Sequence, residues 1–175
     1  GAMDWIDPNA EPTVESESPI TAVVDGHSTF GQVAGRVALD LACEKAAETG
    51  VGVVGVRDAT HMGRIGEWAE RATEEGYLAT LQVATQGGSE TVAPAGSGEP
   101  LYSTNPIAYG VPTFDALDFP IVLDMATSQV AHGKTRLLEK AGKPIPDAWT
   151  TDQRGDPVRD AAVFEGGTGA LMPLG

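Results

Sequence analysis

The chain has 175 residues, long enough for one domain with a sizeable core, and its formal net charge is −14. That charge repels nucleic acid and anionic membrane surfaces, so neither is expected as a partner. No apolar run reaches the roughly 18–20 residues that a membrane-crossing helix requires, and no signal segment is expected at the N-terminus.

The first third of the sequence predicts a strand, a long helix and a second strand. After an extended lead-in over residues 4–19, the β-prone segment Ile20–Val24 closes at an Asp-Gly turn. Ser28 is a suitable N-cap for the helix that follows, and Gly50 is placed to end it. Residues 51–56 form a buried type of strand, whose glycines favour close approach of another backbone.

The rest of the chain alternates strands with amphipathic helices. A helix from about Arg64 has one apolar face and ends at Gly76. The C-terminal part is rich in turns, of which Arg154-Gly155-Asp156-Pro157 is the clearest. The remaining predicted elements are strands at 77–84, 107–111 and 120–123, a long polar loop at 85–98 and a helix at 128–141.

The predicted fold is α+β, because each helix has a single apolar face and so suits a two-layer sandwich with a sheet. A doubly wound dinucleotide-binding domain is disfavoured, since no strand is followed by Gly-x-Gly-x-x-Gly at the start of a helix. The strand over 51–56 is followed instead by Arg57-Asp58-Ala59-Thr60-His61-Met62-Gly63.

A carboxylate stands at the end of an apolar strand, where Pro120–Leu123 leads into Asp124-Met125-Ala126. An unpaired buried charge is costly, so Asp124 is better explained by a ligand or by a helix N-terminus. The carboxylate and the neighbouring backbone amides could hold the hydroxyls or the amide of a nucleotide. The alternative is an N-cap, in which Asp124 or Ser128 accepts N–H groups of the next helix.

His61 is the candidate acid–base residue, because imidazole titrates near neutrality and this one follows a buried strand. The alternative is a structural role in bracing that turn. His27 and His132 show no metal-ligand spacing with Cys43, so no metal site is predicted. We expect His27 in a turn and His132 on an exposed helix face.

The segment Ser128–Thr135 misses the P-loop pattern by one residue, because Ser128 stands in the place of the first glycine. That glycine lets successive backbone N–H groups wrap a phosphate, so the serine favours an ordinary helix start. A nucleotide-phosphate binder that uses Gly133-Lys134-Thr135 is one alternative function, and a non-catalytic acidic module is another.

Several motifs, in their order along the chain, resemble those of the type-2 malate/L-lactate dehydrogenase family, which includes sulfolactate, ureidoglycolate and diketogulonate dehydrogenases. Asp58–Gly63 is similar to the family's Asn-x-x-His-x-Gly segment, with Asp58 in place of the asparagine. The other matching motifs are Ser103-Thr104-Asn105-Pro106, Asp124-Met125-Ala126, Gly133-Lys134 and Met172-Pro173-Leu174-Gly175.

This resemblance implies a non-Rossmann NAD(P)-binding domain over residues 4–175, with a mixed, mostly antiparallel sheet; residues 1–3 are interpreted as a cloning scar. It implies hydride transfer between NAD or NADP and a small 2-hydroxy or 2-oxo acid, with His61 as the catalytic residue. Cofactor contacts are implied for Thr85 (with Ser89 as the fallback), Asn105, Asp124, Met125 and Ala126.

Family members extend beyond this segment, with an N-terminal region that carries Ser-His-Gly and an arginine and a C-terminal Gly-x-Lys-Gly-Tyr-Gly segment. A 2-oxo acid needs a cation for its carboxylate, and that anchor is expected outside this chain. The fragment alone is therefore predicted to be inactive or nearly so. The resemblance also implies a homodimer for the full-length enzyme.

Two further expectations concern the environment of the protein. With 11 Lys and Arg against 25 Asp and Glu, the surface is expected to suit high salt, which screens self-repulsion. The single cysteine, Cys43, cannot form an internal disulfide and falls on the buried side of its predicted helix, so a cytoplasmic setting is the simplest interpretation.

Overall fold

Residues 5–85 and 90–174 are described in the computed structural model of the chain. They form two compact units, each built from two separate stretches of sequence. The first unit comprises Gly1–Leu81 and Ala108–Asp124, and the second comprises Gln82–Ile107 and Met125–Gly175. That the two units act as the single domain predicted over residues 4–175 stays a prediction.

The first unit begins with a three-stranded sheet in the order β1-β2-β3. β1 and β2 are antiparallel, whereas β2 and β3 are parallel. A parallel pair needs a crossover, and helix α1 supplies it between β2 and β3. These elements are β1 (Thr13–Glu17), β2 (Thr21–Asp25), α1 (Gly31–Thr49) and β3 (Val53–Arg57).

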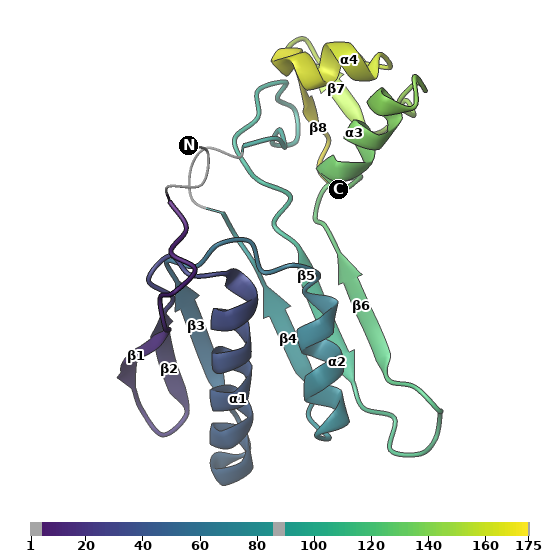
Figure 1. Ribbon diagram of the computed structural model, residues 1–175. Helices are drawn as coiled ribbons and strands as arrows, with labels where there is room; N and C mark the ends of the chain where they lie inside the picture. Colours follow the sequence, from purple (N-terminus) through teal and green to yellow (C-terminus); the bar gives the residue numbers. More distant parts are fainter. Residues whose placement is uncertain (1–4, 86–89, 175) are drawn as a thin grey trace. The chain divides into compact units, whose positions relative to one another are not determined.

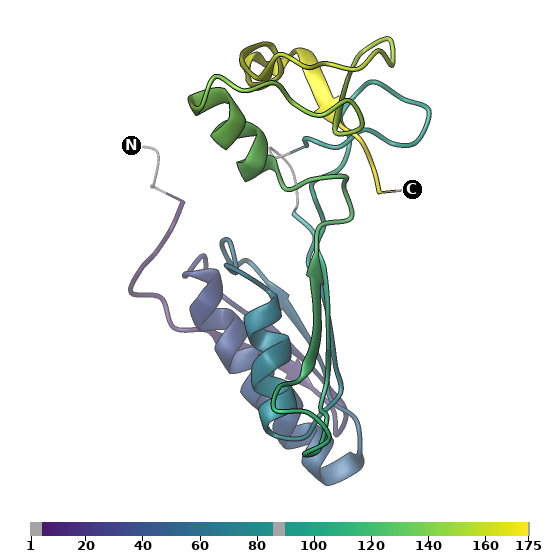
Figure 2. The same ribbon diagram turned by 90° about the vertical axis from the view of Figure 1, so that its right-hand side faces the viewer.

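A second three-stranded sheet follows in the order β4-β5-β6, preceded by helix α2. In the first unit α1 and α2 lie on the same side of the strands (Figures 1 and 2). A side chain at Gly110 of β5 would overlap the Ala69 carbonyl oxygen and the Thr73 methyl group of α2, so glycine permits this close contact. The elements are α2 (Gly66–Glu74), β4 (Ala79–Gln82), β5 (Ile107–Val111) and β6 (Ile121–Met125).

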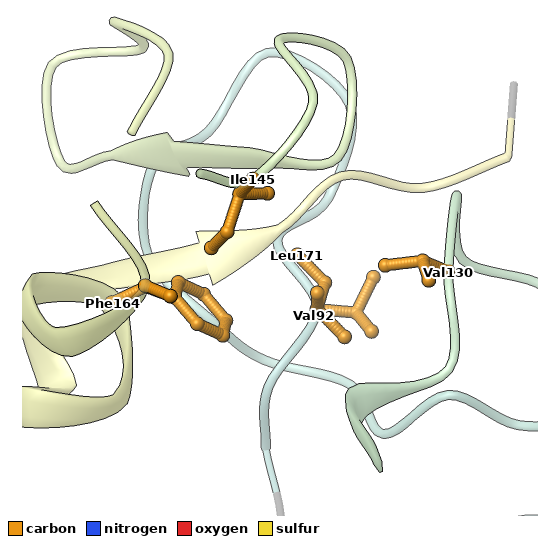
Figure 3. Close-up of a cluster of buried hydrophobic side chains, with 6 residues drawn as sticks. Val92, Val130, Ile145, Phe164 and Leu171 are labelled. Carbon is orange, nitrogen blue, oxygen red and sulfur yellow. The ribbon is translucent and has the colours of Figure 1, made fainter. Parts of the chain in front are cut away.

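The second unit has its own hydrophobic core, formed by side chains from widely separated segments (Figure 3). Ile145 and Leu171 are fully buried at its centre. The core residues are Val92, Val130, Ile145, Ala161, Phe164 and Leu171. The elements are α3 (His132–Lys140), β7 (Thr150–Asp152), α4 (Ala161–Val163), the π-helix η1 (Phe164–Thr168) and β8 (Gly169–Leu171), with β7 and β8 antiparallel.

The predicted α+β class with a mixed, mostly antiparallel sheet is confirmed. The strand predicted at 107–111 has the observed bounds, and Gly50 ends α1 in a left-handed conformation with φ of 86°. Cys43 is buried on α1, as the helical spacing predicts.

Some local predictions were wrong. Ser28 does not cap α1: it lies in a turn with φ of 62°, and the N-cap is Phe30, which makes no side-chain cap. The helix predicted from residue 128 begins at His132, because the backbone N–H of Gln129 donates to Met172 O. The extended lead-in contains strand β1, and the turn-rich C-terminal part contains β7 and β8.

Among the described residues, none of the helices combines the length and the apolar character that crossing a membrane would require.

Candidate active site

The segment that leads to His61 is held against the start of α1 by backbone hydrogen bonds. Ser28 N donates to Asp58 O at 2.6 Å, and Thr60 N donates to Thr29 O at 3.1 Å. The first residue of α1, Gly31, donates its N–H to Thr60 Oγ1 at 3.1 Å. Since the first N–H groups of a helix have no partner within it, the threonine satisfies one of them and fixes the loop.

Gly31 also determines how close α1 comes to His61. A Cβ atom at Gly31 would overlap the carbonyl oxygens of Thr60 and His61. Only a residue without a side chain therefore fits between the helix and this loop. Asp58 itself has a φ of 49°, an uncommon conformation for a residue with a side chain. Strained backbone of this kind is concentrated at functional sites.

The His61 side chain is exposed, and one of its two ring nitrogens is engaged. Gly63 N donates to His61 Nδ1 at 2.9 Å. A backbone N–H can only donate, so Nδ1 accepts, and the neutral ring carries its proton on Nε2. The neighbouring backbone thus selects the tautomer and leaves Nε2 for another partner, an arrangement that suits proton exchange with a ligand.

Asp124 lies at the end of β6 and binds the N-terminus of α2. Gly66 N donates to Asp124 Oδ2 at 2.9 Å, whereas the N-cap residue Ile65 makes no side-chain cap. A Cβ at Gly66 would overlap the Asp124 carboxylate, so the glycine lets the strand approach the helix. The sequence predicted a capping role toward the following helix; the bond is instead to the earlier helix, α2. Since Gly66 is five residues beyond His61 in the sequence, this bond links Asp124 to the segment that follows His61.

Arg64 adds a cation beside Asp124. Its Nη1 and Nη2 atoms donate to the two carboxylate oxygens of Glu70, at 3.0 and 2.5 Å. The hydrogen bond to Glu70 raises the pKa of Arg64, with a smaller contribution from Asp124, and the same bond lowers the pKa of Glu70. The sequence analysis did not select Arg64; its position three residues after His61 was the available signal.

In the second unit, Asn105 lies next to the segment after Ala126. Thr127 N donates to Thr104 O at 2.9 Å, and Thr127 Oγ1 donates to Asn105 O at 3.0 Å. Asn105 has a φ of 33°, and its Oδ1 atom is buried without a hydrogen-bond partner among the described residues. Such an unsatisfied acceptor is costly, so it favours a ligand that would donate to it.

The structure fixes the other residues predicted to contact the cofactor through fewer hydrogen bonds of their own. Met125 and Ala126 are half-buried. Met125 follows Asp124, which is hydrogen-bonded to Gly66, and Ala126 precedes Thr127, which is hydrogen-bonded to Asn105. Thr85 is exposed, two residues after Val83, whose N–H donates to Pro106 O at 3.1 Å. Ser89 lies outside the described residues.

The P-loop interpretation fits the structure poorly. Two of the backbone N–H groups that would bind phosphate are already occupied: Gln129 N donates to Met172 O and Lys134 N to Ala131 O. Ser128 is buried, and its hydroxyl donates to Val130 O at 2.8 Å. A phosphate would have to displace these bonds.

His132 has a partner that the sequence analysis missed. Its Nε2 atom is 3.2 Å from Glu165 Oε2, and Thr135 Oγ1 lies 2.6 Å from Glu165 Oε1. His132 is therefore partly buried rather than on an exposed helix face. The two segments are separated by 33 residues, and no local period marks that pairing. Within residues 5–85 and 90–174 no group of three or more His, Cys, Asp or Glu side chains could hold a metal ion.

Comparison with known proteins gives the family. The family model of malate/L-lactate dehydrogenase matches residues 2–175. A malate dehydrogenase from Pyrococcus abyssi is 41% identical over 160 residues, which are 91% of this chain and 42% of that protein. A Δ1-pyrroline-2-carboxylate/Δ1-piperideine-2-carboxylate reductase from Pseudomonas aeruginosa is 39% identical over 167 residues, 95% of this chain and 48% of that protein.

Solved structures show the same fold. The crystal structure of malate dehydrogenase from Entamoeba histolytica aligns with a TM-score of 0.90 and 32% identity, covering 99% of this chain and 48% of that one. An α+β unit with His61 after β3 and Asp124 near the end of β6 is thus found in a chain that matches one family of dehydrogenases over residues 2–175. The chain belongs to the malate/L-lactate dehydrogenase family, and it spans about half the length of the relatives it matches.

Proposed function

We propose that the chain is the NAD(P)-binding part of an oxidoreductase that interconverts small 2-hydroxy and 2-oxo acids. The observation that carries this proposal is the geometry at His61, whose Nδ1 is occupied by Gly63 N–H while the ring is exposed, in a family of malate and L-lactate dehydrogenases. The relatives include a malate dehydrogenase, an L-sulfolactate dehydrogenase and a Δ1-pyrroline-2-carboxylate/Δ1-piperideine-2-carboxylate reductase, and each of these names contains a small carboxylic acid.

His61 is proposed as the catalytic acid–base residue. In the reductive direction Nε2–H donates a proton to the oxygen that was the ketone, and in the oxidative direction Nε2 accepts it. The Gly63 N–H keeps Nδ1 in the accepting role, so the exchangeable proton stays on the exposed nitrogen. The nicotinamide cofactor supplies or accepts the hydride when bound.

The cofactor-binding residues are proposed to be Asp124, Met125, Ala126, Asn105 and Thr85, with Ser89 as the alternative to Thr85. An exposed carboxylate such as Asp124 suits ribose hydroxyls, and the buried Oδ1 of Asn105 suits an amide N–H. Residues 1–3 are interpreted as a cloning scar and residues 4–175 as the binding domain. A homodimer, a cytoplasmic setting and a surface suited to high salt remain proposals for the full-length enzyme.

Binding can be tested on this chain directly. Titration with NADH and with NADPH, followed by cofactor fluorescence, should show saturable binding of at least one of them. Asn105→Ala should weaken that binding by about 10-fold, the equivalent of roughly 1.4 kcal/mol, while Asn9→Ala, on the exposed N-terminal segment, should leave it unchanged. If neither cofactor binds at millimolar concentration, the proposal fails.

A test of the acid–base role must measure turnover, which the isolated chain is not expected to show. In a full-length enzyme that contains this segment, His61→Asn should lower kcat by roughly 10²–10⁴-fold and leave the Kd for the cofactor within about twofold. His27→Asn, in a different loop, is the matched control. An unchanged kcat in His61→Asn would remove His61 from this role.

A further inference from the structure

Gln32, in the first turn of α1, lies against the loop that carries His61. A Cβ atom at Gly63 would be 3.2 Å from Gln32 Nε2 and within 3.8 Å of its Cγ and Cδ atoms, so the glutamine side chain lies directly beside this glycine. The preceding residue, Gly31, packs against the backbone of His61. Two consecutive residues of α1 therefore contact the loop at two nearby positions, His61 and Gly63.

Gly63 is the common neighbour of the Gln32 amide and the His61 ring. Its backbone N–H donates to His61 Nδ1 at 2.9 Å. Its φ of 76° is a conformation that favours glycine, and a side chain at this position would press against Gln32. The loop thus holds the histidine ring on one side of Gly63 and leaves the space beside it to the glutamine.

The Gln32 amide is available to a ligand. Gln32 is exposed, and its side chain forms no hydrogen bond with the part of the chain that the structure describes. The first turn of α1 contains no acidic residue, and the Asp58 carboxylate of the loop is bound to Arg57. No carboxylate among these residues therefore occupies the two N–H donors of the amide.

We propose that Gln32 donates a hydrogen bond to the ketone oxygen of the 2-oxo acid, the same oxygen that His61 protonates. This inference rests on the proposed function. A neutral amide suits that oxygen, whereas the substrate carboxylate needs a cation.

The bond would stabilise the charge that develops during the reaction. When hydride adds to the carbonyl carbon, the π electrons of the C=O bond move to the oxygen, which then takes its proton from His61 Nε2. Gln32 keeps its own proton, so the balance of the step is unchanged. Because the oxygen is most negative in the transition state, the hydrogen bond from Gln32 is strongest there.

Steady-state kinetics on a full-length enzyme that contains this segment test the proposal, with oxaloacetate, pyruvate and sulfopyruvate as substrates. Gln32→Ala should lower kcat by roughly 100-fold and change KM by less than about threefold. Gln153→Ala, at an exposed glutamine of the second unit, is the matched control and should keep the wild-type kcat. An unchanged kcat in Gln32→Ala overturns the inference and leaves the proposed function standing, whereas a wild-type enzyme that reduces none of the three acids contradicts both.

Gln32→Glu separates a substrate contact from a role in packing the loop. The variant keeps the shape of the side chain beside Gly63 but replaces the donor with a carboxylate, so kcat should fall at least as far as in Gln32→Ala. The protonated carboxyl regains a donor, so activity relative to the wild type should rise as the pH falls. A packing role alone predicts the wild-type kcat at every pH, and that result would overturn the inference.

Binding of oxamate supplies a readout that needs no turnover. Oxamate is an unreactive analogue of a 2-oxo acid, and its amide oxygen carries partial negative charge. In the presence of the reduced cofactor, followed by cofactor fluorescence, its Kd should rise about 5- to 10-fold in both Gln32→Ala and Gln32→Glu. The Kd of the cofactor alone should stay unchanged, and circular dichroism verifies that the variants are folded. Equal oxamate affinity in the wild type and both variants would also overturn the assignment.

Discussion

The two units of this chain are stabilised in different ways. In the first, helices contact strands through small residues: Gly110 lies against Ala69, and Gly52 lies against the backbone of Ala42. In the second, the centre is filled by large apolar side chains such as Ile145 and Leu171, brought together from segments with little regular structure. We therefore expect an added atom at Gly110 to damage the first unit and removed atoms at Leu171 to damage the second.

The largest effect is expected from removing volume in the second unit. Leu171→Ala deletes a side chain that is fully buried among Val92, Ile145 and Phe164. It should lower the free energy of unfolding by about 2–5 kcal/mol, measured by urea denaturation. Leu137→Ala, at an exposed position on α3, should cost less than about 0.5 kcal/mol. Equal losses from the two variants would show that the side chains around Leu171 do not form a tightly packed core (Figure 3).

Adding one carbon in the first unit should cost somewhat less. Gly110→Ala forces its new methyl group against the Ala69 carbonyl oxygen and the Thr73 methyl group, so α2 must move away from β5. We expect a loss of about 1–3 kcal/mol in the free energy of unfolding. Gly55→Ala on β3 is the matched control, because nothing lies within 4 Å of a Cβ there. If both variants were equally stable, the contrast between the units would be lost.

The bond from Asp124 to α2 tests whether this carboxylate has a structural role as well as the proposed cofactor contact. Asp124→Ala leaves Gly66 N–H without its acceptor and should lower the free energy of unfolding by about 1 kcal/mol. Asp124→Asn retains an acceptor oxygen and should retain most of the stability. Losing cofactor affinity in Asp124→Asn without losing stability would separate the two roles; a loss of stability equal to that of Asp124→Ala would contradict the capping assignment.

The sequence was most informative where structure depends on local spacing. The apolar period of α1 and its Gly50 end, and the strand at 107–111, all follow from neighbouring residues. Ser28 was wrongly predicted to cap α1, because serine is a common N-cap residue. In the structure the backbone N–H of Ser28 donates to Asp58 O, and the side chain that accepts the first N–H of α1 is that of Thr60. Propensity describes what a residue can do, and the fold decides which of those options is used.

Long-range pairings were the part that the sequence could not supply. The acceptor for Gly66 N–H is 58 residues away at Asp124, and the Glu165 partner of His132 is 33 residues away. Neither separation follows a helix or strand period. The residue types of the candidate site, a histidine after one strand and a carboxylate near the end of another, were recognisable in the sequence, but the helix that Asp124 caps was not.

The stability of the chain is expected to depend on pH through Cys43, which is buried on α1. Burial, reinforced by Glu75 and Asp40, raises the pKa of this thiol to about 11. An unfolded cysteine ionises at lower pH, so the folded state keeps its full advantage below about pH 8.5 and loses it as the pH rises toward 11. The free energy of unfolding should fall by about 2 kcal/mol by pH 10, and this component of the pH dependence should be absent in Cys43→Ala. A wild-type profile identical to that of Cys43→Ala would contradict the shift.

The smallest expected effect is an increase in the free energy of unfolding, at Gly133 in the second unit. Gly133 lies in the first turn of α3, with nothing within 4 Å of a Cβ at that position. Gly133→Ala should therefore raise the free energy of unfolding by about 0.5–1 kcal/mol, because alanine loses less backbone freedom on entering a helix. The same glycine-to-alanine change destabilises at Gly110 and stabilises at Gly133 because a helix backbone faces the first and open space faces the second. A destabilised Gly133→Ala chain would mean that α3 has a neighbour at this position.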